Sequence, residues 1–324
     1  VTRTCPNIIK YTPEPLFVTY FQEGEQPMKK MLLIMNPNAG LKKANKYLTD
    51  ILMIFAKHDY EVTVCLTQKS GDATEYAKTL AASHDLAVCI GGDGTFNETI
   101  EGIVDSNCGV PVGYIPSGST NDFAASMGLS RRVLTAAEDV VTGIERKIDI
   151  GKFNDRYFSY VASFGAFTKV SYTTSQDLKN VLGHMAYVLE GIKDLPTIRA
   201  EHIRLETENG SIDGDYIFGA ICNSTSLGGI LTINPDVVDM NDGLFEILLV
   251  RLPRNIIELN NIIFALNNHD YSGDMITFLS ASHAEIFASA QMAWTLDGEF
   301  MNGSDKIVMQ NIHDAIRIIV PGEK

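Results

Sequence analysis

A glycine-rich run at residues 91–98, Gly-Gly-Asp-Gly-Thr-Phe-Asn-Glu, has the composition of a loop that can bind phosphate. Glycines permit left-handed backbone and let amide groups approach a ligand closely. The run follows an apolar stretch and opens a helical pattern, so free N–H groups at a helix start would face an anion. Thr95 and Glu98 have the spacing of a capping box, which predicts that the helix starts there. A purely structural turn needs only one or two glycines, and we therefore favour a phosphate site.

This run fits neither of two common phosphate-binding motifs. The chain has no Walker sequence, and Asn97 stands where a dinucleotide fingerprint requires its third glycine. Asp93 inside the loop would repel a phosphate unless a divalent cation lay between them. The loop together with Asp93 therefore predicts nucleotide phosphates bound with Mg²⁺, a cation that prefers water and carboxylate oxygens.

Two further polar loops follow other predicted strands. Residues 36–40 (Asn-Pro-Asn-Ala-Gly) come after the first strand, and residues 116–122 (Pro-Ser-Gly-Ser-Thr-Asn-Asp) come between a later strand and a helix. Parallel strands end at one common rim, where ligands of open α/β sheets bind. We therefore expect the three loops to share one site.

The elements that would position these loops alternate between strand and helix. Strand-like runs occupy residues 31–35, 61–66, 86–90 and 110–115, and helical spacing occupies residues 42–57, 72–82, 95–104, 122–127 and 131–142. This alternation implies parallel pairing. It predicts an α/β N-terminal domain with a doubly wound, mostly parallel sheet.

The pattern changes after Ile148. Strand-like runs at residues 152–162, 203–208, 216–223, 245–250, 283–288, 293–296 and 316–320 are separated by the turn pairs Asn209-Gly210, Asp213-Gly214, Asp242-Gly243 and Asn302-Gly303. Helical stretches at 178–189 and 255–266 interrupt them. We expect a C-terminal antiparallel β-sandwich domain, which makes two lobes with an interdomain cleft.

Composition excludes several classes of protein. The 324 residues suffice for about two domains, and 26 Lys and Arg against 40 Asp and Glu give a net charge of −14. This balance argues against a nucleic-acid partner and against a broadly polybasic membrane anchor. No apolar run reaches the length of a spanning helix. Five cysteines without a CxxC pair fit reduced thiols, and so a cytoplasmic location.

Residues 1–27 read differently from the rest, because they hold four of the eleven prolines and no sustained period. Residues 22–25 can be encoded by a purine-rich ribosome-binding sequence placed before Met28 in a bacterial gene. We expect residues 1–27 to be a non-native or disordered N-terminal extension, with an ordinary flexible tail as the alternative.

The three loops resemble the catalytic domain of diacylglycerol kinases, a pattern also present in sphingosine and ceramide kinases. NAD kinases and phosphofructokinases share Gly-Gly-Asp-Gly-Thr, so this motif alone is less specific. The second half is similar to the soluble bacterial diacylglycerol kinases, and the resemblance runs from Met28 to the C-terminus. It is carried by Lys-Ile-Asp-Ile-Gly at 147–151, Cys-Asn-Ser at 222–224, Gly-Gly at 228–229, Asp-Gly-Leu-Phe at 242–245 and Asp-Gly-Glu at 297–299.

The resemblance implies catalytic roles for four acidic residues. Asp93, Asp122 and Asp149 would hold, through water molecules, the catalytic Mg²⁺ with ATP, and Glu299 would be the general base. Without the resemblance, Asp149 reads as a charge at a strand end. Residues 297–299 would likewise be an acidic hairpin turn.

The resemblance also implies a structural Mg²⁺ bound by the carboxylate of Asp242 and the backbone carbonyls of Asp239 and Leu244. From the residues alone, Asp242-Gly243 is a turn without a metal. The nucleotide site would be lined by Asn36, Pro37, Asn38, Ala39, Gly40, Thr67, Gly91, Gly92, Asp93, Gly94, Thr95, Phe96, Asn97 and Ser119. The family often has Ser or Thr at position 39 and Thr at position 119. Ala39 therefore lacks the family's hydroxyl, whereas Ser119 keeps one.

By this resemblance we expect an ATP- and Mg²⁺-dependent lipid kinase that phosphorylates diacylglycerol to phosphatidic acid. Its nucleotide-binding domain would comprise residues 28–148 and 311–324, and the sandwich residues 149–310. The enzyme would be cytoplasmic and would visit the membrane surface for its lipid substrate; a homodimer is compatible with the family. The alternatives are a kinase for another lipid alcohol, such as a sphingoid base, a kinase for NAD, or a non-catalytic regulator that binds nucleotide or lipid.

Some apolar and basic residues could meet a lipid surface. Phe264, Met275, Phe278 and Leu279 could touch lipid, although packing in a core is the ordinary reading of such residues. The local positive charges could face anionic headgroups if they cluster, with a solvated surface as the alternative. These charges are Lys29, Lys30, Lys42, Lys43, Lys46, Arg131, Arg132, Arg251 and Arg254.

Overall fold

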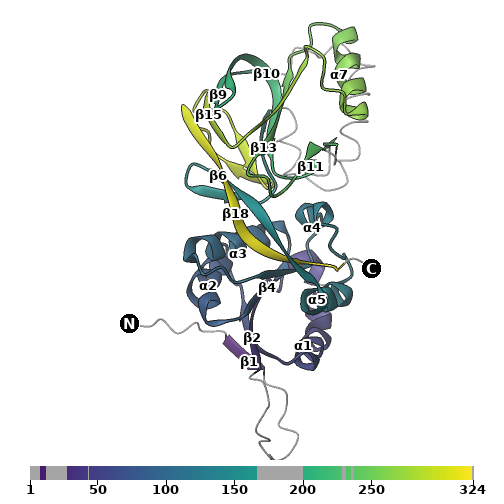
Figure 1. Ribbon diagram of the computed structural model, residues 1–324, viewed down its shortest axis with the longest axis vertical. Coiled ribbons are helices and arrows are strands. Elements are labelled where there is room, and N and C mark those ends of the chain that lie inside the picture. Colours follow the sequence, from purple (N-terminus) through teal and green to yellow (C-terminus); the bar gives the residue numbers. More distant parts are fainter. Residues whose placement is uncertain are drawn as a thin grey trace, which may run out of the picture. The chain divides into compact units, whose positions relative to one another are not determined.

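The computed structural model describes residues 8–11, 28–42, 44–165, 200–227, 231–234 and 237–322. The helix expected at 178–189, the Gly-Gly pair at 228–229 and most of residues 1–27 lie outside these ranges. The chain divides into two compact units, one reaching to Lys147 and including the final stretch from Ile316, the other running from Ile148 to Ala315. Two strands, β6 (Ile144–Phe153) and β18 (Lys306–Val320), run from one unit into the other (Figure 1).

The first unit is built on a parallel sheet. Its strand order is β3 (Tyr60–Leu66), β2 (Lys29–Met35), β4 (Leu86–Gly91), β5 (Val112–Pro116) and the end of β18, and every neighbouring pair is parallel. The short β1 (Ile8–Tyr11) adds an antiparallel edge beside β3. β4 is buried along its whole length, as expected for a strand covered on both faces. The predicted doubly wound sheet is confirmed.

Helices cover both faces of this sheet (Figure 1). α1 (Leu48–Lys57) and α5 (Val133–Thr142) share one apolar core with the strands, whereas α2 (Asp72–Leu80) and α3 (Asp93–Ser106) pack together on the opposite face. The predicted single helix at 42–57 is wrong at its start, because the short 3-10 turn η2 (Ala44–Tyr47) precedes α1. Residues 42–46 offer only one small apolar side chain, Ala44, and therefore have no face to bury.

The second unit is built from antiparallel strand pairs, as predicted. Its strands are β7 (Arg156–Phe158), β8 (Val161–Gly165), β9 (Glu201–Thr207), β10 (Gly210–Cys222), β13 (Phe245–Arg251), β14 (Ile276–Ala281), β15 (His283–Phe287), β16 (Trp294–Leu296) and β17 (Glu299–Met301), with parts of β6 and β18. A separate ribbon joins β11 (Ser226–Leu227) and β12 (Leu231–Thr232). The one helix described in this unit is α7 (Ile256–Asn268).

Aromatic residues fill the core of the second unit. Trp294 is fully buried, and its ring meets Phe153 and Phe164 edge-on at centroid distances of 5.2 and 4.9 Å. Phe158 stacks on Phe245. Burial of each such side chain contributes about 1.5–3 kcal/mol, with a further increment for each aromatic pair. This packing fixes β16, and therefore the hairpin that carries Glu299.

Two strand predictions in this unit are wrong. The expected strand at 152–162 is interrupted at Asn154, whose left-handed φ of 51° turns the chain between β6 and β7. The expected turn at Asp213-Gly214 lies inside β10, opposite Arg204 and Ile203. The turn at Asn209-Gly210 already reverses the chain, and the pairing with β9 then continues without a break.

The cysteines and the helices bear on where in the cell the protein could be located. Cys65, Cys89, Cys108 and Cys222 form no disulfide bond among the described residues, and Cys5 lies outside them. Among the described helices, none combines the length and the apolar character that crossing a membrane requires.

Candidate functional site

The loops after β2 and β4 flank the point where the winding of the first unit's sheet reverses. β2 and β4 are neighbours, but the chain leaves β2 toward α1 on one face and leaves β4 toward α3 on the other. Open α/β sheets bind their ligands beyond the carboxyl ends of the strands at such a point. The loop after β5 lies at the same edge of the sheet, where the carboxyl ends of the parallel strands meet.

Asn36 joins the first loop to the start of α3. Its backbone N–H donates to the carbonyl of Ile90, and its Nδ2 donates to Oγ1 of Thr95 over 3.1 Å. Its Oδ1 accepts the N–H of Asn38 at 2.9 Å, which shapes the loop itself. All polar groups of the Asn36 side chain therefore hold backbone or side chains of the rim in place.

Glycines let the loops approach one another closely. Gly40 has a φ of +50°, and a Cβ atom there would lie 1.7 Å from the carbonyl oxygen of Ser117. A Cβ on Gly118 would lie 2.6 Å from Cα of Gly92. Residues 36–40, 91–92 and 117–121 thus meet backbone to backbone, which only glycine allows. The structure brings these three predicted loops together.

The start of α3 differs from the prediction. Gly92 is the N-cap residue and α3 begins at Asp93, so Thr95 lies inside the first turn and no capping box forms. Glu98 instead accepts hydrogen bonds from Oγ of Ser70 and the N–H of Gly71, at 2.7 and 2.8 Å. The first N–H groups of a helix have no partner within it, so the glycine run still offers amides to an anion.

Asp93 and Asp122 lie next to each other. The Asp93 carboxylate accepts the N–H groups of Asp122 and Phe123 and the hydroxyl of Thr120, and so caps the short helix α4 (Asp122–Ser126). Burial raises the pKa of the Asp93 carboxyl, against these hydrogen bonds. Burial, and then the charge of Asp93, raise the pKa of Asp122 to about 6, against the opposing effect of Arg131. A cation bound between these two carboxylates would reduce the repulsion between their charges.

The remaining residues predicted for the nucleotide site surround these loops. Thr67 is buried, and its N–H donates to the carbonyl of Met35 at the end of β2. The carbonyl of Pro37 accepts from Nδ2 of Asn45, and Ser119 is exposed between Gly118 and α4. Phe96 is instead buried, and its ring stacks on that of Tyr114 with the centroids 4.3 Å apart. It therefore packs beneath the loop and does not line the nucleotide site. Asn38 is exposed, Ala39 and Gly94 are half-buried, and Asn97 is buried.

Asp149 lies in the second unit, and its carboxylate is fully buried. It accepts the N–H of Gly243 at 2.7 Å, the N–H of Asp314 at 2.8 Å and Nδ1 of His313 at 2.9 Å. Since a carboxylate only accepts, Nδ1 of His313 carries the hydrogen. Asp149, His313 and Asp314 each offer one ligand atom within 4.8 Å of the others, so this cluster could hold a cation.

The loop predicted to bind a structural metal contacts Asp149 through Gly243. Asp242 Oδ1 accepts the N–H of Leu244, and the carbonyl of Leu244 accepts Nδ2 of Asn311. Asp239 Oδ1 likewise accepts the N–H of Asn241, so both aspartates of the predicted metal site already shape the loop.

Glu246 follows this loop and was not predicted. Its side chain is 1% exposed, and Oε2 has no hydrogen-bond partner among the described residues. Burial, followed by the charges of Asp242 and Asp239, raises the pKa of Glu246 to about 8. An orphaned carboxylate oxygen beside two further carboxylates fits a cation, because a cation would neutralise all three.

Glu299 is exposed at the start of β17, directly after a turn held by Asp297. The buried Asp297 carboxylate accepts the N–H groups of Ser159, Tyr160 and Val161 and the hydroxyl of Ser159, over 2.6–3.0 Å. Burial raises its pKa to about 6 despite these bonds. Asp297 and Gly298 both have positive φ, so the hairpin is tight. Asp297 therefore fixes the backbone from which Glu299 projects.

Comparison with known proteins bears on both units. Residues 30–153 match the family described as "Diacylglycerol kinase catalytic domain", and residues 161–320 match the "YegS C-terminal NAD kinase beta sandwich-like domain". A diacylglycerol kinase of Bacillus subtilis (strain 168) is 33% identical over 300 residues, which cover 92% of this chain and 98% of that relative. This chain belongs to the diacylglycerol kinase family. It is thus an enzyme of that family.

Other members of the diacylglycerol kinase family match over similar lengths. The diacylglycerol kinase of Staphylococcus epidermidis (strain RP62A) is 31% identical over 295 residues, 90% of this chain and 92% of that relative. A crystal structure of a diacylglycerol kinase from Bacillus anthracis str. Sterne has a TM-score of 0.72 at 23% identity, over 91% of this chain and 98% of that one. The fold is therefore that of a solved protein.

The sequence did not point to three residues near the predicted metal sites: Glu246, His313 and Asp314. Glu246 had a readable signal, because it is a charge inside the apolar strand run Phe-Glu-Ile-Leu-Leu-Val. His313 and Asp314 had none, since only the pairing of β18 with β6 brings them to Asp149.

Proposed function

We propose that this protein transfers the γ-phosphoryl group of ATP to the free hydroxyl of diacylglycerol and so produces phosphatidic acid. The observation that carries the proposal is the meeting of three Gly/Asn loops around Asp93, in a chain of the diacylglycerol kinase family. Phosphoryl transfer depends on positioning and on charge stabilisation, and rigid loops lined by amides supply both.

ATP would lie along the rim of the first unit. The amides at the start of α3 would face its phosphates, with the hydroxyl of Ser119 beside them, and residues 36–40 and Thr67 would border the nucleotide. The rim keeps its shape without ligand because Asn36 and Glu98 bind its loops from within. Such preorganisation limits the entropy lost on binding.

We assign Mg²⁺ to two groups of carboxylates. Asp93, Asp122 and Asp149 would hold the catalytic ion through water molecules, and Asp242 with the carbonyls of Asp239 and Leu244 would hold a structural ion. The repulsion between Asp93 and Asp122 and the orphaned oxygen of Glu246 support this assignment. When bound, Mg²⁺ neutralises charge on the phosphoryl oxygens.

Glu299 would accept the proton of the acceptor hydroxyl. A free alcohol is a weak nucleophile and requires a positioned base. The carboxylate of Glu299 is exposed, and the hydrogen bonds of Asp297 limit the motion of its turn. The acceptor is a lipid, so we also propose that the enzyme meets it at a membrane surface.

The test of this proposal is Glu299→Gln, assayed with labelled ATP and diacylglycerol in mixed micelles. We expect unchanged ATP affinity by calorimetry and a kcat lower by about 10²–10⁴-fold, because the amide cannot accept the proton. Asp305→Asn is the control, since Asp305 is an exposed acid in the loop after the same hairpin. A turnover close to the parent value in Glu299→Gln would reject Glu299 as the base.

An acceptor panel separates the proposed substrate from its alternatives. Diacylglycerol is expected to exceed a sphingoid base, other lipid alcohols and NAD in kcat/KM. Preference for another acceptor would reassign the substrate. Intact ATP binding without transfer to any acceptor would instead indicate a regulator.

A further inference from the structure

Asn223 lies in the Cys-Asn-Ser run at residues 222–224 and joins two segments of the second unit. It is the first residue after β10, and its side chain is completely buried. Its Nδ2 donates to the backbone carbonyl of Asp149 in β6 over 2.8 Å. Its own N–H donates to the carbonyl of Tyr160, just before β8, over 3.1 Å. Asn223 therefore connects β6 with the segment that leads into β8.

Asp149, the first partner of Asn223, is held in place by other groups as well. Its N–H donates to the carbonyl of Met240 over 2.9 Å. Its carboxylate accepts three hydrogen bonds, from Gly243, His313 and Asp314. Four hydrogen bonds thus hold Asp149 without the asparagine. Asp149 is therefore a fixed point to which Asn223 is attached.

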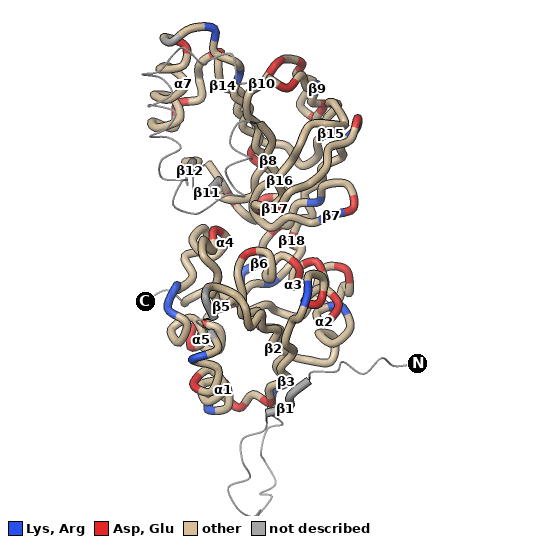
Figure 2. Tube along the Cα trace, turned by 180° about the vertical axis from the view of Figure 1, so that it is seen from behind, with Lys and Arg blue, Asp and Glu red and all other residues tan. Residues whose placement is uncertain are grey.

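The second partner, the segment at residues 159–161, carries the turn of Glu299. The Asp297 carboxylate accepts the N–H groups of all three residues, and the N–H of Asp297 donates to the carbonyl of Val161 over 2.9 Å. Figure 2 shows β8, β16 and β17 side by side, in agreement with their antiparallel pairing. A movement of residues 159–161 would therefore move the turn from which Glu299 projects.

An asparagine suits this position because it places a hydrogen-bond donor next to the carbonyl of Asp149. An aspartate would present only acceptors to this carbonyl, and an alanine would remove its donor. Oδ1 of Asn223 has no hydrogen-bond partner among the described residues, and its burial costs stability. The side-chain amide thus serves the bond from Nδ2 to Asp149.

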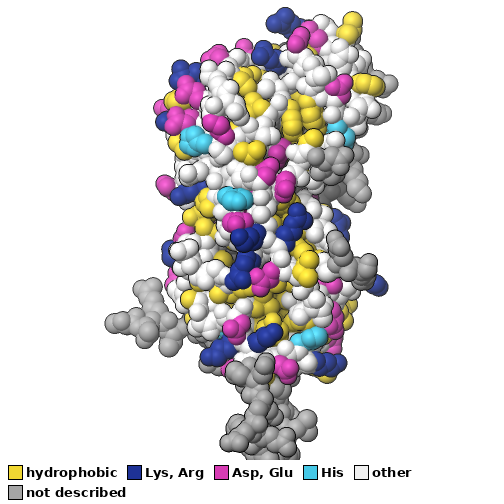
Figure 3. All heavy atoms as spheres, viewed as in Figure 1, with side chains coloured by type: hydrophobic (Ala, Val, Ile, Leu, Met, Phe, Trp, Pro, Cys, Tyr) yellow, Lys and Arg dark blue, Asp and Glu magenta, His cyan; other side chains and the backbone are white. Residues whose placement is uncertain are grey.

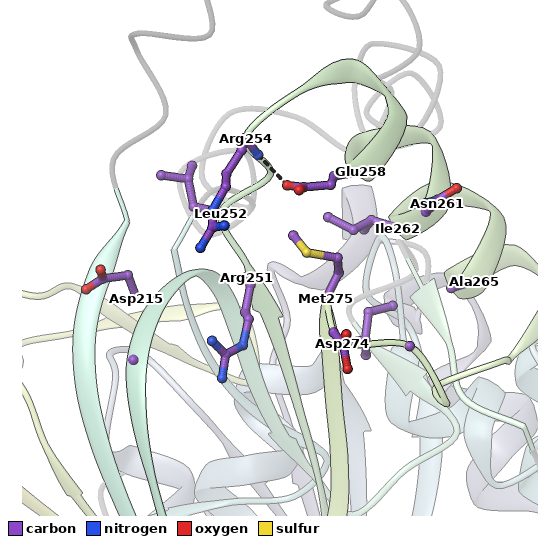
Figure 4. A pocket seen from close by; sticks show the side chains of 13 residues that line it. Asp215, Arg251, Leu252, Arg254, Glu258, Asn261, Ile262, Ala265, Asp274 and Met275 are labelled. Carbon is purple, nitrogen blue, oxygen red and sulfur yellow. Dashed lines mark hydrogen bonds between the residues drawn. The ribbon is translucent and has the colours of Figure 1, made fainter.

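Burial shows that this hydrogen-bond path, from Asp149 through Asn223 to residues 159–161 and Asp297, acts from within the unit. The side chains of the path are at most 5% exposed at Asp149, Ser159, Asn223 and Asp297. Beside the path, His313 is 54% exposed, and Figure 3 shows a histidine next to acidic side chains on the surface over β18. The pocket of about 720 Å³ in Figure 4 is lined by other residues of this unit, where Arg251 lies among acidic side chains such as Asp274. Asn223 therefore cannot contact a substrate, but it can position a residue that does.

We propose that Asn223 is a positioning residue, which holds the turn of Glu299 at a fixed place relative to Asp149. The inference rests on the proposed function, because that function gives Glu299 and Asp149 their roles in the reaction. A base must lie within about 3 Å of the proton that it accepts. A misplacement of about 1 Å can lower the rate about 10²-fold, even when its cause is distant from the reacting atoms.

The first test is Asn223→Ala, assayed with labelled ATP and diacylglycerol in mixed micelles. We expect kcat to fall by about 10–100-fold, because the turn of Glu299 loses its support. The KM for ATP and the Mg²⁺ concentration for half-maximal turnover should stay within about twofold, since the proposed nucleotide loops belong to the first unit and Asp149 keeps its other hydrogen bonds. Asn209→Ala is the matched control, because Nδ2 of Asn209 also donates to a backbone carbonyl, that of Ser280, over 3.0 Å. Its kcat should equal that of the parent protein.

The second test combines Asn223→Ala with Glu299→Gln and separates positioning of the base from a structural role. In the Glu299→Gln background, Asn223→Ala should lower kcat no further than about twofold, because the group that Asn223 positions is already gone. An asparagine that serves only the fold would lower kcat by the same factor in both backgrounds. Equal factors would therefore overturn the proposal.

Hydrogen exchange measures the same support without any turnover. In Asn223→Ala the amides of residues 159–161 should exchange about tenfold faster or more, whereas those of β9 should keep their rates. Asn223→Ser replaces this variant if Asn223→Ala does not fold. The serine hydroxyl is shorter than the amide and does not reach the carbonyl of Asp149, so the same changes in kcat and in exchange are expected.

These measurements distinguish the positioning role from the proposed function. Failure of the parent protein to phosphorylate any acceptor would reject the function, and hydrogen exchange would still decide whether Asn223 supports residues 159–161. In an active kinase, parent-like exchange of these amides or a parent-like kcat in Asn223→Ala would overturn the positioning role.

Discussion

Asp93 and Asp122 show how a pair of neighbouring carboxylates, here proposed to hold a cation, costs stability. Asp122 is half-buried and next to a second carboxylate, and its side chain accepts no hydrogen bond from the residues that the structure describes. Burial and Asp93 raise its pKa from 3.8 to about 6 in the folded protein. An acid whose folded pKa exceeds its unfolded pKa destabilises the fold once it ionises. The penalty is absent below about pH 4, grows through this window and is complete above about pH 6.

Asp122→Asn is therefore predicted to stabilise the ligand-free protein at neutral pH. The amide has the same shape without the charge, and we expect the free energy of unfolding to rise by about 1–3 kcal/mol at pH 7.5. The gain should vanish near pH 4.5, and turnover should fall strongly at every pH. Urea unfolding across this range, together with the kinase assay, measures both effects.

The control for this prediction is Asp50→Asn on α1, an exposed acid. Its stability should stay within about 0.5 kcal/mol of the parent value at each pH. If Asp122→Asn were destabilising at pH 7.5, repulsion from Asp93 would not be the dominant influence on Asp122.

At the scale of elements, the site depends on how closely three loops approach. Gly40 is the most constrained point, since it combines a left-handed φ with a Cβ position 1.7 Å from the Ser117 carbonyl. An alanine there must move residues 36–40 away from residues 117–121. Gly109 offers a comparison with similar backbone but no neighbour, because φ is +62° and nothing lies within 4 Å of a Cβ.

We predict that Gly40→Ala costs more than about 3 kcal/mol, whereas Gly109→Ala costs about 1 kcal/mol. The difference isolates the clash from the backbone conformation. Chemical denaturation gives both values, and calorimetric titration with ATP should show lost binding only for Gly40→Ala. Equal costs in the two variants would mean that the loops can separate freely.

The sequence predicts these elements better than the contacts between them. Continuous apolar runs sufficed for β2 and β4, because strands buried on both faces leave a strong pattern, and the alternation of apolar residues sufficed for β3, which is only partly buried. The capping box failed because Thr95 and Glu98 each had a more favourable partner, Asn36 and Gly71, that is distant in the sequence. Local spacing cannot report such partners. The cluster around Asp149 escaped for the same reason.

At the scale of the whole molecule, the first unit is completed by the last strand of the chain. The end of β18 pairs with β5 through Ile318 and Val112, and Ile316, Ile318 and Val320 are buried there. Arg317 adds a salt bridge of 2.7 Å to Glu145 and hydrogen bonds to the carbonyl of Gly109. The residues that we propose to bind the nucleotide all precede Asp149, yet the last strand of their sheet follows the second unit in the sequence.

Truncation after Ala315 should therefore disable the proposed nucleotide site without removing any of its residues. Three buried side chains contribute about 1.5–3 kcal/mol each, and their loss approaches the whole stability of a typical domain, about 5–15 kcal/mol. We expect the truncated protein to lose ATP binding by calorimetry and to show faster hydrogen exchange in β4 and β5. The strands β13 and β16 of the second unit should keep their protection from exchange, because their core does not include residues beyond Ala315.

Truncation after Gly322, which retains the whole of β18, is the control, and this variant should bind ATP as the full chain does. Parent-like ATP binding after truncation at Ala315 would mean that the parallel sheet of the first unit is stable without its last strand.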